Sequence, residues 1–231
     1  GSSDDNPEKM CQLLNRFIAT GVDGLIVAPC AHTEKLLSDI VRNSVPVVIF
    51  DRDLENLAGV GKVMMDNEYA GRQATRHLIA QGRKRIIHVT GDMNYTASLE
   101  RLNGFVRAMR DSHIPITADS ILYADFFEES AYRQITGLLD RDIHPDAVFA
   151  GADKTAYGVL RALMNAGISI PGETAVIGFD DDTPDSRDII FPGLSTMRQP
   201  MYEMGCAAVE LLLAAIRDPA HQPETRCFQP Q

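Results

Sequence analysis

The chain of 231 residues is 45% hydrophobic and 23% charged, and 32 acidic against 22 basic residues give a formal net charge of −10. This apolar fraction is ordinary for a globular protein and argues against wholesale disorder. No apolar run approaches the roughly 20 residues of a membrane helix, and this stretch shows no signal-peptide pattern. Because affinity for nucleic acids comes mostly from clustered Lys and Arg, the acidic balance argues against a direct grip on phosphate backbone.

The predicted elements alternate between helix and strand along the whole chain. Asn6-Pro7-Glu8 begins a helix that ends at Gly21, because Asn caps, Pro fits the first turn and Gly allows a left-handed end. Apolar runs then predict strands at 25–28, 47–50, 60–65, 86–89, 121–124, 147–150 and 174–178, with a last strand beginning at 227. Helical spacing predicts helices at 33–41, 66–82, 98–112, 128–140, 153–166 and 199–216, with an irregular stretch at 180–196.

Strands that are buried on both faces and separated by helices indicate an α/β fold with parallel sheets and right-handed crossovers. The periodicity leaves open whether the strands form one doubly wound sheet or two smaller ones.

The four cysteines are predicted to be reduced thiols rather than a structural disulfide. Cys11, Cys30, Cys206 and Cys227 form no C-x-x-C pair and lie at no zinc spacing with histidine. Cys11 and Cys206 fall inside amphipathic helical patterns, where a free cysteine packs as a small apolar residue. This usage favours a reducing, cytoplasmic location.

Acidic residues follow most of the predicted strands. Ligands of open parallel sheets bind beyond the carboxyl ends of the strands. Such an edge suits a polyhydroxylated ligand. Carboxylates accept hydrogen bonds from hydroxyls, Arg donates to ligand oxygens, and an aromatic ring covers an apolar sugar face. The residues at these positions are Asp51-Arg52, Asp66-Asn67, Gly91-Asp92, Asp125-Phe126, Gly151 to Asp153, and Asp180 to Asp182. For Asp66, Asp125 and Asp153, a role as helix N-caps is the favoured alternative.

Patterns typical of enzymes are absent from the sequence. Gly59-x-Gly61 lacks the third glycine of a dinucleotide fingerprint, and no phosphate loop, nucleophile elbow or H-E-x-x-H pattern occurs. The triplet from Asp180 to Asp182 is a weak magnesium signal, because no second acid stands at matching spacing. We therefore expect no enzymatic activity, no cofactor and no metal.

Three stretches, in order, form a recognisable pattern. The first runs from Asp66-Asn67-Glu68-Tyr69-Ala70-Gly71 to Gly82, and the second is Glu100-Arg101-Leu102-Asn103-Gly104-Phe105. The third is Ile177-Gly178-Phe179-Asp180-Asp181, which continues to Leu194-Ser195-Thr196-Met197-Arg198-Gln199-Pro200. Together they resemble the effector-binding domain of the LacI/GalR (lactose-repressor) family of bacterial transcriptional regulators.

This resemblance implies a fold like that of type I periplasmic binding proteins, with two doubly wound parallel-sheet subdomains and a ligand cleft between them. One subdomain comprises 1–65 and 197–228, and the other comprises 66–196 and 229–231. Family members begin with a helix-turn-helix DNA-binding module, a hinge and a βαβ unit. We expect this stretch to lack these parts and the final strand, which leaves an apolar sheet edge uncovered.

The resemblance also implies ligand contacts at Asp51, Arg52, Tyr95, Arg101, Phe126, Asp153 and Asp180. Without it, Arg101 is interpreted as a surface arginine paired with Glu100 or Asp92. Ala152 stands where many members carry Asn, so we expect an effector other than the commonest one.

The function implied is binding of a sugar or related metabolite, homodimerisation, and ligand-driven closure of the subdomains that controls operator binding. Operator DNA is contacted only through the absent module. The candidate dimer face is the helix at 153–166, with Tyr157, Leu160, Arg161 and Met164, although core packing is favoured for Leu160 and Met164. The alternative is a periplasmic sugar receptor of a transporter, and an α/β enzyme that uses the Asp180 cluster is a third hypothesis.

Overall fold

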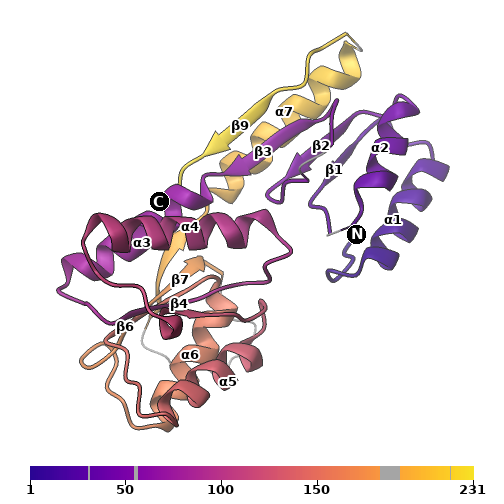
Figure 1. Cartoon of the computed structure of the whole chain (residues 1–231). Helices are drawn as coiled ribbons and strands as arrows, with labels where there is room; N and C mark the ends of the chain where they lie inside the picture. Colours follow the sequence, from indigo (N-terminus) through magenta and orange to yellow (C-terminus); the bar gives the residue numbers. More distant parts are fainter. Residues whose placement is uncertain (31, 55–56, 183–192, 219) are drawn as a thin grey trace. The chain divides into compact units, whose positions relative to one another are not determined.

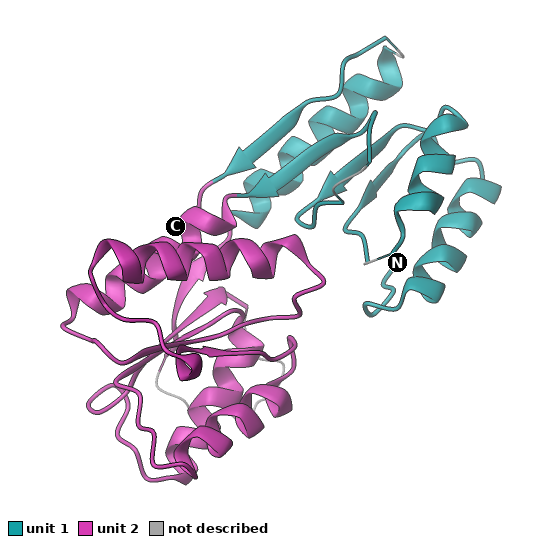
Figure 2. Ribbon diagram, viewed as in Figure 1, with its two compact units in different colours: residues 1–65, 200–228 teal, residues 66–199, 229–231 magenta. Residues whose placement is uncertain are grey.

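The computed structural model describes residues 1–30, 32–54, 57–182, 193–218 and 220–231. The chain divides into two compact units, which Figure 2 shows in different colours. Unit 1 comprises residues 1–65 and 200–228, and unit 2 comprises 66–199 and 229–231. Residues 197–199 thus belong to unit 2, whereas the family resemblance implied a boundary at 196–197.

Unit 1 is built on a four-stranded parallel sheet, in the order β1 (Leu25–Val27), β2 (Val47–Phe50), β3 (Gly61–Met65) and β9 (Thr225–Phe228). The helices of this unit are α1 (Pro7–Ala19), α2 (Glu34–Arg42) and α7 (Met201–Arg217), which Figure 1 shows beside the strands. Strand β1 lies at the edge of the described sheet, and its Ile26 is 41% exposed.

The two faces of this sheet are covered by different helices. Met10 and Leu14 of α1 and Leu37 of α2 pack in one core cluster with Val47 and Ile49 of β2. Side chains alternate along a strand, so Val48 points to the other face. That face carries α7, because a Cβ on Gly61 of β3 would contact both Val48 and Leu211 of α7.

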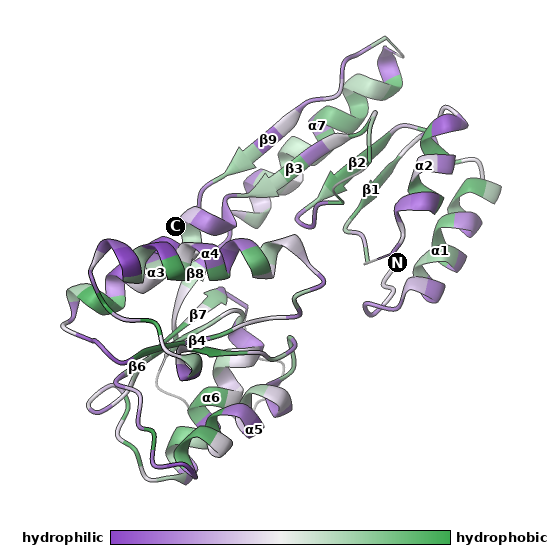
Figure 3. Ribbon diagram, viewed as in Figure 1, coloured by the Kyte–Doolittle hydropathy of each residue, from purple (hydrophilic) through white to green (hydrophobic). Residues whose placement is uncertain are grey.

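Unit 2 contains a five-stranded parallel sheet in the order β5 (Ile121–Leu122), β4 (Ile86–Val89), β6 (Ala147–Ala150), β7 (Ala175–Asp180) and β8 (Ser195–Arg198). Its helices are α3 (Asn67–Ala80), α4 (Thr96–Asp111), α5 (Glu128–Leu139) and α6 (Asp153–Asn165), with a short 3-10 turn η1 (Ala118–Ser120). Helices α5 and α6 pack with β4 and β6 in one core cluster, and α3 and α4 lie on the other face (Figure 1). Figure 3 shows β2 and β6 in the hydrophobic colour, as expected of strands that helices cover on both faces.

Glycines bring the helices of unit 2 into backbone contact. A Cβ on Gly71 of α3 would lie 2.3 Å from the Arg101 carbonyl oxygen, and one on Gly104 of α4 would lie 2.2 Å from that of Glu68. Helices α5 and α6 cross in the same way at Gly158, where a Cβ would lie 2.1 Å from the Glu128 carbonyl oxygen. These contacts fix α4 against the first turns of α3.

Most predicted elements are present, and two predictions about strands are wrong. The strand predicted at 121–124 is only Ile121–Leu122. Strand β8 was missed inside the stretch predicted to be irregular, because its four residues are exposed or half-buried and form no apolar run. Residues 183–192 of that stretch lie outside the described residues. Among the residues described, we find no helix with the length and apolar character to cross a membrane.

Candidate functional site

The candidate site lies where the parallel strands of unit 2 end. The carboxyl ends of β4, β6 and β7 lead directly to Gly91, Gly151 and Asp180, and α4 contributes Arg101. Parallel strands have their carboxyl ends at one edge of the sheet, where α/β proteins bind ligands. Five of the predicted ligand residues therefore come from this single edge or its connections: Tyr95, Arg101, Phe126, Asp153 and Asp180.

Arg101 is a buried arginine at the centre of this edge, and it is only 5% exposed. Its Nε donates to Asn67 Oδ1 at 2.9 Å, and its Nη1 donates to the Gly151 carbonyl at 2.6 Å. The guanidinium also stacks on the Phe179 ring, with Cζ 3.5 Å from the ring centroid. The alternative interpretation of Arg101 as an exposed surface arginine is therefore wrong, because the side chain is buried.

Asp180 lies beside this arginine at the end of β7. Its Oδ1 is 4.0 Å from Arg101 Nη1 and accepts a hydrogen bond from Gln199 Nε2 at 2.7 Å. The φ angle of Asp180 is +120°, a backbone conformation that costs a non-glycine residue about 1–3 kcal/mol. Strain of this kind persists only where surrounding contacts hold the residue, and it is concentrated at binding sites. The Asp180 side chain remains about one-third exposed, so the pair can meet a ligand from solvent.

Asp153 begins α6, yet it does not cap that helix. It is 1% exposed, with Oδ1 accepting from Thr196 Oγ1 at 2.7 Å and Oδ2 accepting from the Asp182 backbone N–H at 2.8 Å. Burial raises the pKa of the Asp153 carboxyl, and these hydrogen bonds oppose the rise. The carboxylate thus ties β8 and the residues after β7 to α6.

The capping predictions have mixed outcomes. Asp66 caps α3, because its side chain accepts from the Tyr69 N–H at 2.9 Å. The N-cap residue of α6 is Ala152 and that of α5 is Phe127, so capping is the wrong role for Asp153 and Asp125. Asp125 instead accepts from the Phe127 N–H at 2.8 Å, which shapes the loop before α5.

Two aromatic rings, from the connections that follow β4 and β5, lie together in space. The centroids of Tyr95 and Phe126 are 5.8 Å apart, with the rings tilted by 51°. Phe126 packs on Gly91, where a Cβ would lie 2.2 Å from its ring, so only glycine fits there. An aromatic surface next to a charged pair suits a ligand with one apolar and one hydroxylated face.

His88 of β4 is a buried titratable residue outside the predicted set of ligand contacts. It is 0% exposed and stacks on Phe149 at 4.5 Å and Phe105 at 5.5 Å between ring centroids. Its Nδ1 lies 2.9 Å from the Phe149 carbonyl oxygen. Burial, together with the Arg101 charge, lowers the pKa of His88 to about 4, so the ring is neutral at pH 7.

Asp51 and Arg52, the other two predicted ligand residues, belong to unit 1. Arg52 pairs with Asp5, and both Asp51 and Arg52 line a cavity of about 410 Å³. Asp51 has a φ angle of +66°, and its buried Oδ1 has no hydrogen-bond partner among the described residues. Their ligand role stays a prediction.

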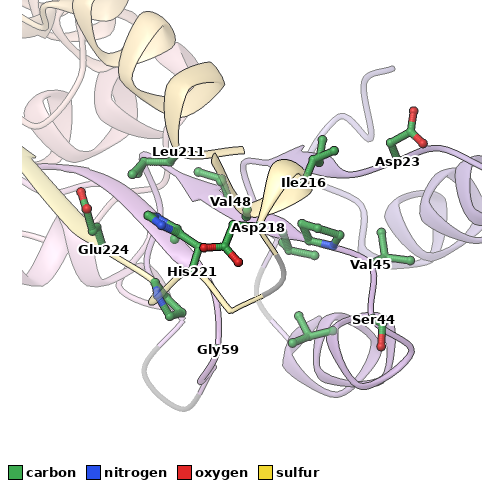
Figure 4. Close-up of a pocket in the computed structure, with 16 residues that line it drawn as sticks. Asp23, Ser44, Val45, Val48, Gly59, Leu211, Ile216, Asp218, His221 and Glu224 are labelled. Atoms are coloured by element: carbon green, nitrogen blue, oxygen red, sulfur yellow. The ribbon is translucent and has the colours of Figure 1, made fainter. Parts of the chain in front are cut away.

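A second cavity of unit 1, of about 480 Å³, opens at the amino ends of its strands (Figure 4). Its wall includes Asp218, His221 and Glu224 beside the apolar Val48 and Leu211. It lies at the sheet edge opposite to the one where α/β proteins bind ligands. Within the described residues, no cluster of three His, Cys, Asp or Glu side chains is arranged to hold a metal ion.

The described cysteines are free thiols, as predicted. Cys30 is buried and Cys11 is partly buried, whereas Cys206 and Cys227 are exposed. The prediction that Cys206 packs as a buried apolar residue is therefore wrong, because α7 turns that side of the helix to solvent.

Comparison with known proteins identifies the family. Residues 75–231 match the family model of the periplasmic binding protein-like domain. The HTH-type transcriptional repressor PurR of Actinobacillus pleuropneumoniae is 31% identical over all of this chain and 68% of the repressor. The chain belongs to the effector-binding domains of the LacI family of transcriptional regulators.

Other relatives of this LacI-family domain are also transcriptional regulators. Catabolite control protein A of Priestia megaterium is 31% identical, over 91% of this chain and 63% of that protein. The solved complex of the transcriptional regulator CelR with cellobiose has a TM-score of 0.85 and 29% identity, over 96% of this chain and 68% of that one. A LacI-family regulator from Enterococcus faecium with bound ribose has a TM-score of 0.81 and 28% identity, over 97% of this chain and 81% of that one. The relatives named here are regulators and not enzymes, and the chain spans about two thirds of the curated ones.

Proposed function

We propose that this LacI-family domain binds a sugar or a related hydroxylated metabolite and thereby controls operator binding by an intact regulator. The observation that carries the proposal is the buried Arg101 beside Asp180 at the carboxyl edge of the unit 2 sheet. Arg101 would donate to ligand oxygens and Asp180 would accept from hydroxyls, while Tyr95 and Phe126 would cover an apolar ring face. The bound cellobiose and ribose of two relatives support this ligand class.

The proposal gives Asp153 an indirect role. Both of its carboxylate oxygens are engaged by Thr196 and Asp182, so it holds the segment that follows Asp180 rather than meeting the ligand itself. Asp51 and Arg52 remain proposed ligand contacts on the strength of the family resemblance.

Regulation would follow from ligand affinity that differs between conformations. A ligand that prefers a closed arrangement of the two units shifts the population toward it, and the coupling to DNA affinity is reciprocal. The DNA-reading module would lie outside this acidic stretch, in keeping with its net charge of −10. A cytoplasmic regulator is favoured over a periplasmic receptor because the relatives named above act on transcription.

Calorimetric titration with a panel of sugars that includes ribose and cellobiose tests the proposal. Arg101→Lys and Asp180→Asn should each weaken binding by about 2–5 kcal/mol, because Lys lacks the forked guanidinium donors and Asn lacks the carboxylate charge that the ligand would contact. Arg110→Ala is the control, since this exposed arginine lies in the last turn of the same helix. Unchanged affinity in both site variants would refute the assignment of the ligand pair.

The proposed homodimer is tested separately by sedimentation at micromolar concentration. Helix α6 offers little of the candidate face: Leu160 is 5% exposed, as the favoured core packing predicts, and Arg161 pairs with Glu128 and Glu129 of α5. Core packing is the wrong prediction for Met164, which is 51% exposed and is available for such a contact. A monomer throughout the micromolar range would contradict dimerisation of this domain.

A further inference from the structure

Both members of the Arg101–Asp180 pair are held by amide side chains that stand next to the points where the chain changes unit. Asn67 is the second residue of unit 2, which the chain enters at Asp66. Gln199 is the last residue before the chain returns to unit 1 at Pro200. Asn67 is 3% exposed and Gln199 is 8% exposed, so each amide is a buried polar group whose orientation its hydrogen bonds determine.

Asn67 orients the arginine from the first turn of α3. Its Oδ1 accepts from Arg101 Nε at 2.9 Å, and its Nδ2 donates to Glu100 Oε2 at 3.3 Å. The crossing of α3 and α4 at Gly71 and Gly104 leaves no room for the two helices to slide, so the amide is held at a defined place beside the guanidinium.

Gln199 orients the aspartate from the residue that follows β8. Its Nε2 donates to Asp180 Oδ1 at 2.7 Å, and its backbone N–H donates to the Asp180 carbonyl at 3.5 Å. The strained backbone of Asp180, with φ at +120°, needs such restraint to keep one geometry.

We propose that Asn67 and Gln199 are positioning residues that set the geometry of the Arg101–Asp180 pair and couple it to the two connecting segments that they adjoin. Any ligand that draws the arginine or the aspartate toward itself then acts on both segments through these amides. Conversely, a change in either segment alters the 4.0 Å separation of the charged groups and so the affinity for ligand. The ligand part of this inference rests on the proposed function, whereas the positioning part does not.

The positioning part is tested without any ligand, on the full 231-residue chain labelled with ¹⁵N. The Arg101 Nε–H signal is assigned by its loss in Arg101→Lys, and its hydrogen exchange is then compared between variants. Asn67→Leu should speed this exchange about tenfold or more because the acceptor is lost, while Asn67→Asp should keep it within about threefold because a carboxylate also accepts. Asp180→Ala should likewise speed exchange of the Gln199 side-chain amide.

A general loss of structure would speed exchange in both Asn67 variants alike. A difference in the Arg101 Nε–H exchange rate between Asn67→Leu and Asn67→Asp therefore distinguishes positioning from a general effect on stability. If Asn67→Leu does not fold, Asn67→Ala takes its place in the comparison. The matched control is Asn103→Leu, an exposed amide on α4 two residues from Arg101, which should leave the exchange unchanged. Equal exchange in the wild type and Asn67→Leu, or in the wild type and Asp180→Ala, would overturn the assignment of that amide.

The second measurement is titration with ribose and with cellobiose. For whichever sugar binds the wild type, Asn67→Leu and Gln199→Leu should raise Kd about tenfold or more, and Asn103→Leu should change it less than about twofold. Unchanged Kd values in both site variants would refute the coupling to ligand. If neither sugar binds the wild type, the choice of sugar in the proposed function fails, and the exchange data still decide the positioning role.

Discussion

At the scale of single residues, the candidate site is organised around a buried guanidinium that several groups engage. Removing a guanidinium from water costs several kcal/mol unless it is paired and hydrogen-bonded. Arg101 meets this requirement with Asn67, the Gly151 carbonyl and the face of Phe179, in addition to Asp180. The same region contains a histidine that is neutral because it is buried, and this has a consequence for stability.

His88 should make the domain less stable as the pH falls. Its pKa is about 4 in the folded state and near 6.5 when unfolded, so between these values the unfolded chain binds a proton that the folded one does not. Stability from this residue is fully present above about pH 6.5 and falls by ~3 kcal/mol on reaching pH 4. Urea unfolding of the wild type and of His88→Phe at several pH values should show a shallower pH dependence in the variant. Parallel curves would contradict this, and His144→Gln is the exposed control.

Asp153 should contribute to stability through its two acceptor oxygens. Asp153→Asn removes the negative charge and leaves one amide oxygen to accept, so the hydrogen bonds that Thr196 Oγ1 and the Asp182 N–H donate to the carboxylate cannot both be kept. We expect a loss of about 1–3 kcal/mol in the free energy of unfolding by urea. Asp142→Asn, whose side chain is 98% exposed, should change it by less than about 0.5 kcal/mol. An equal effect of the two substitutions would show that the Asp153 contacts are not stabilising.

At the scale of elements, glycines determine how closely the helices of unit 2 approach. Gly71 and Gly104 place the backbones of α3 and α4 in contact, and this contact brings Asn67 to Arg101. The sequence predicts both helices well, because their apolar faces recur at helical spacing. It did not predict the crossing, because a glycine inside a helix looks the same whether it meets another backbone or solvent.

Gly71→Ala should be destabilising because its Cβ would lie 2.3 Å from a backbone oxygen that cannot move away freely. We expect a loss of about 1–3 kcal/mol in the free energy of unfolding. Gly137→Ala in α5 is the matched control, since nothing lies within 4 Å of its added Cβ, and helix propensity should make it stabilising by about 0.5–1 kcal/mol. Denaturant unfolding distinguishes the two, and substitutions of the same sign and size would refute the close crossing.

At the scale of the whole molecule, the chain forms two compact units, each built from segments far apart in the sequence. Unit 2 contains the buried charged pair and the aromatic rings, and the comparisons assign the whole chain to one family. A ligand that binds the native state and not the unfolded chain stabilises the fold by mass action.

A sugar that binds should therefore raise the thermal stability of the domain. At a ligand concentration of 100 times Kd, the stabilisation is about 2.7 kcal/mol, and it should appear as a higher midpoint in calorimetric unfolding. For Arg101→Lys, the same sugar concentration should raise the midpoint by less than half as much as in the wild type, because the weaker affinity reduces the stabilisation. A full shift in this variant would show that the sugar binds elsewhere.

The sequence by itself determined the α/β class, most element positions, the family, and the candidacy of Arg101, Asp180, Tyr95 and Phe126. These follow from local periodicity and from motifs that are contiguous in the chain. Only the tertiary structure decided which side chains hold these residues, since Asn67 and Arg101 are 34 positions apart and Asp153 and Thr196 are 43 apart. It also revealed strand β8, the rings that enclose His88 and the non-capping role of Asp153. The physical reason is that burial and hydrogen-bond partners depend on contacts between distant segments, which local spacing does not encode. The acidic balance that first argued against nucleic-acid binding now has specific contributors, because Asp153 and Asp180 are integral to the candidate site.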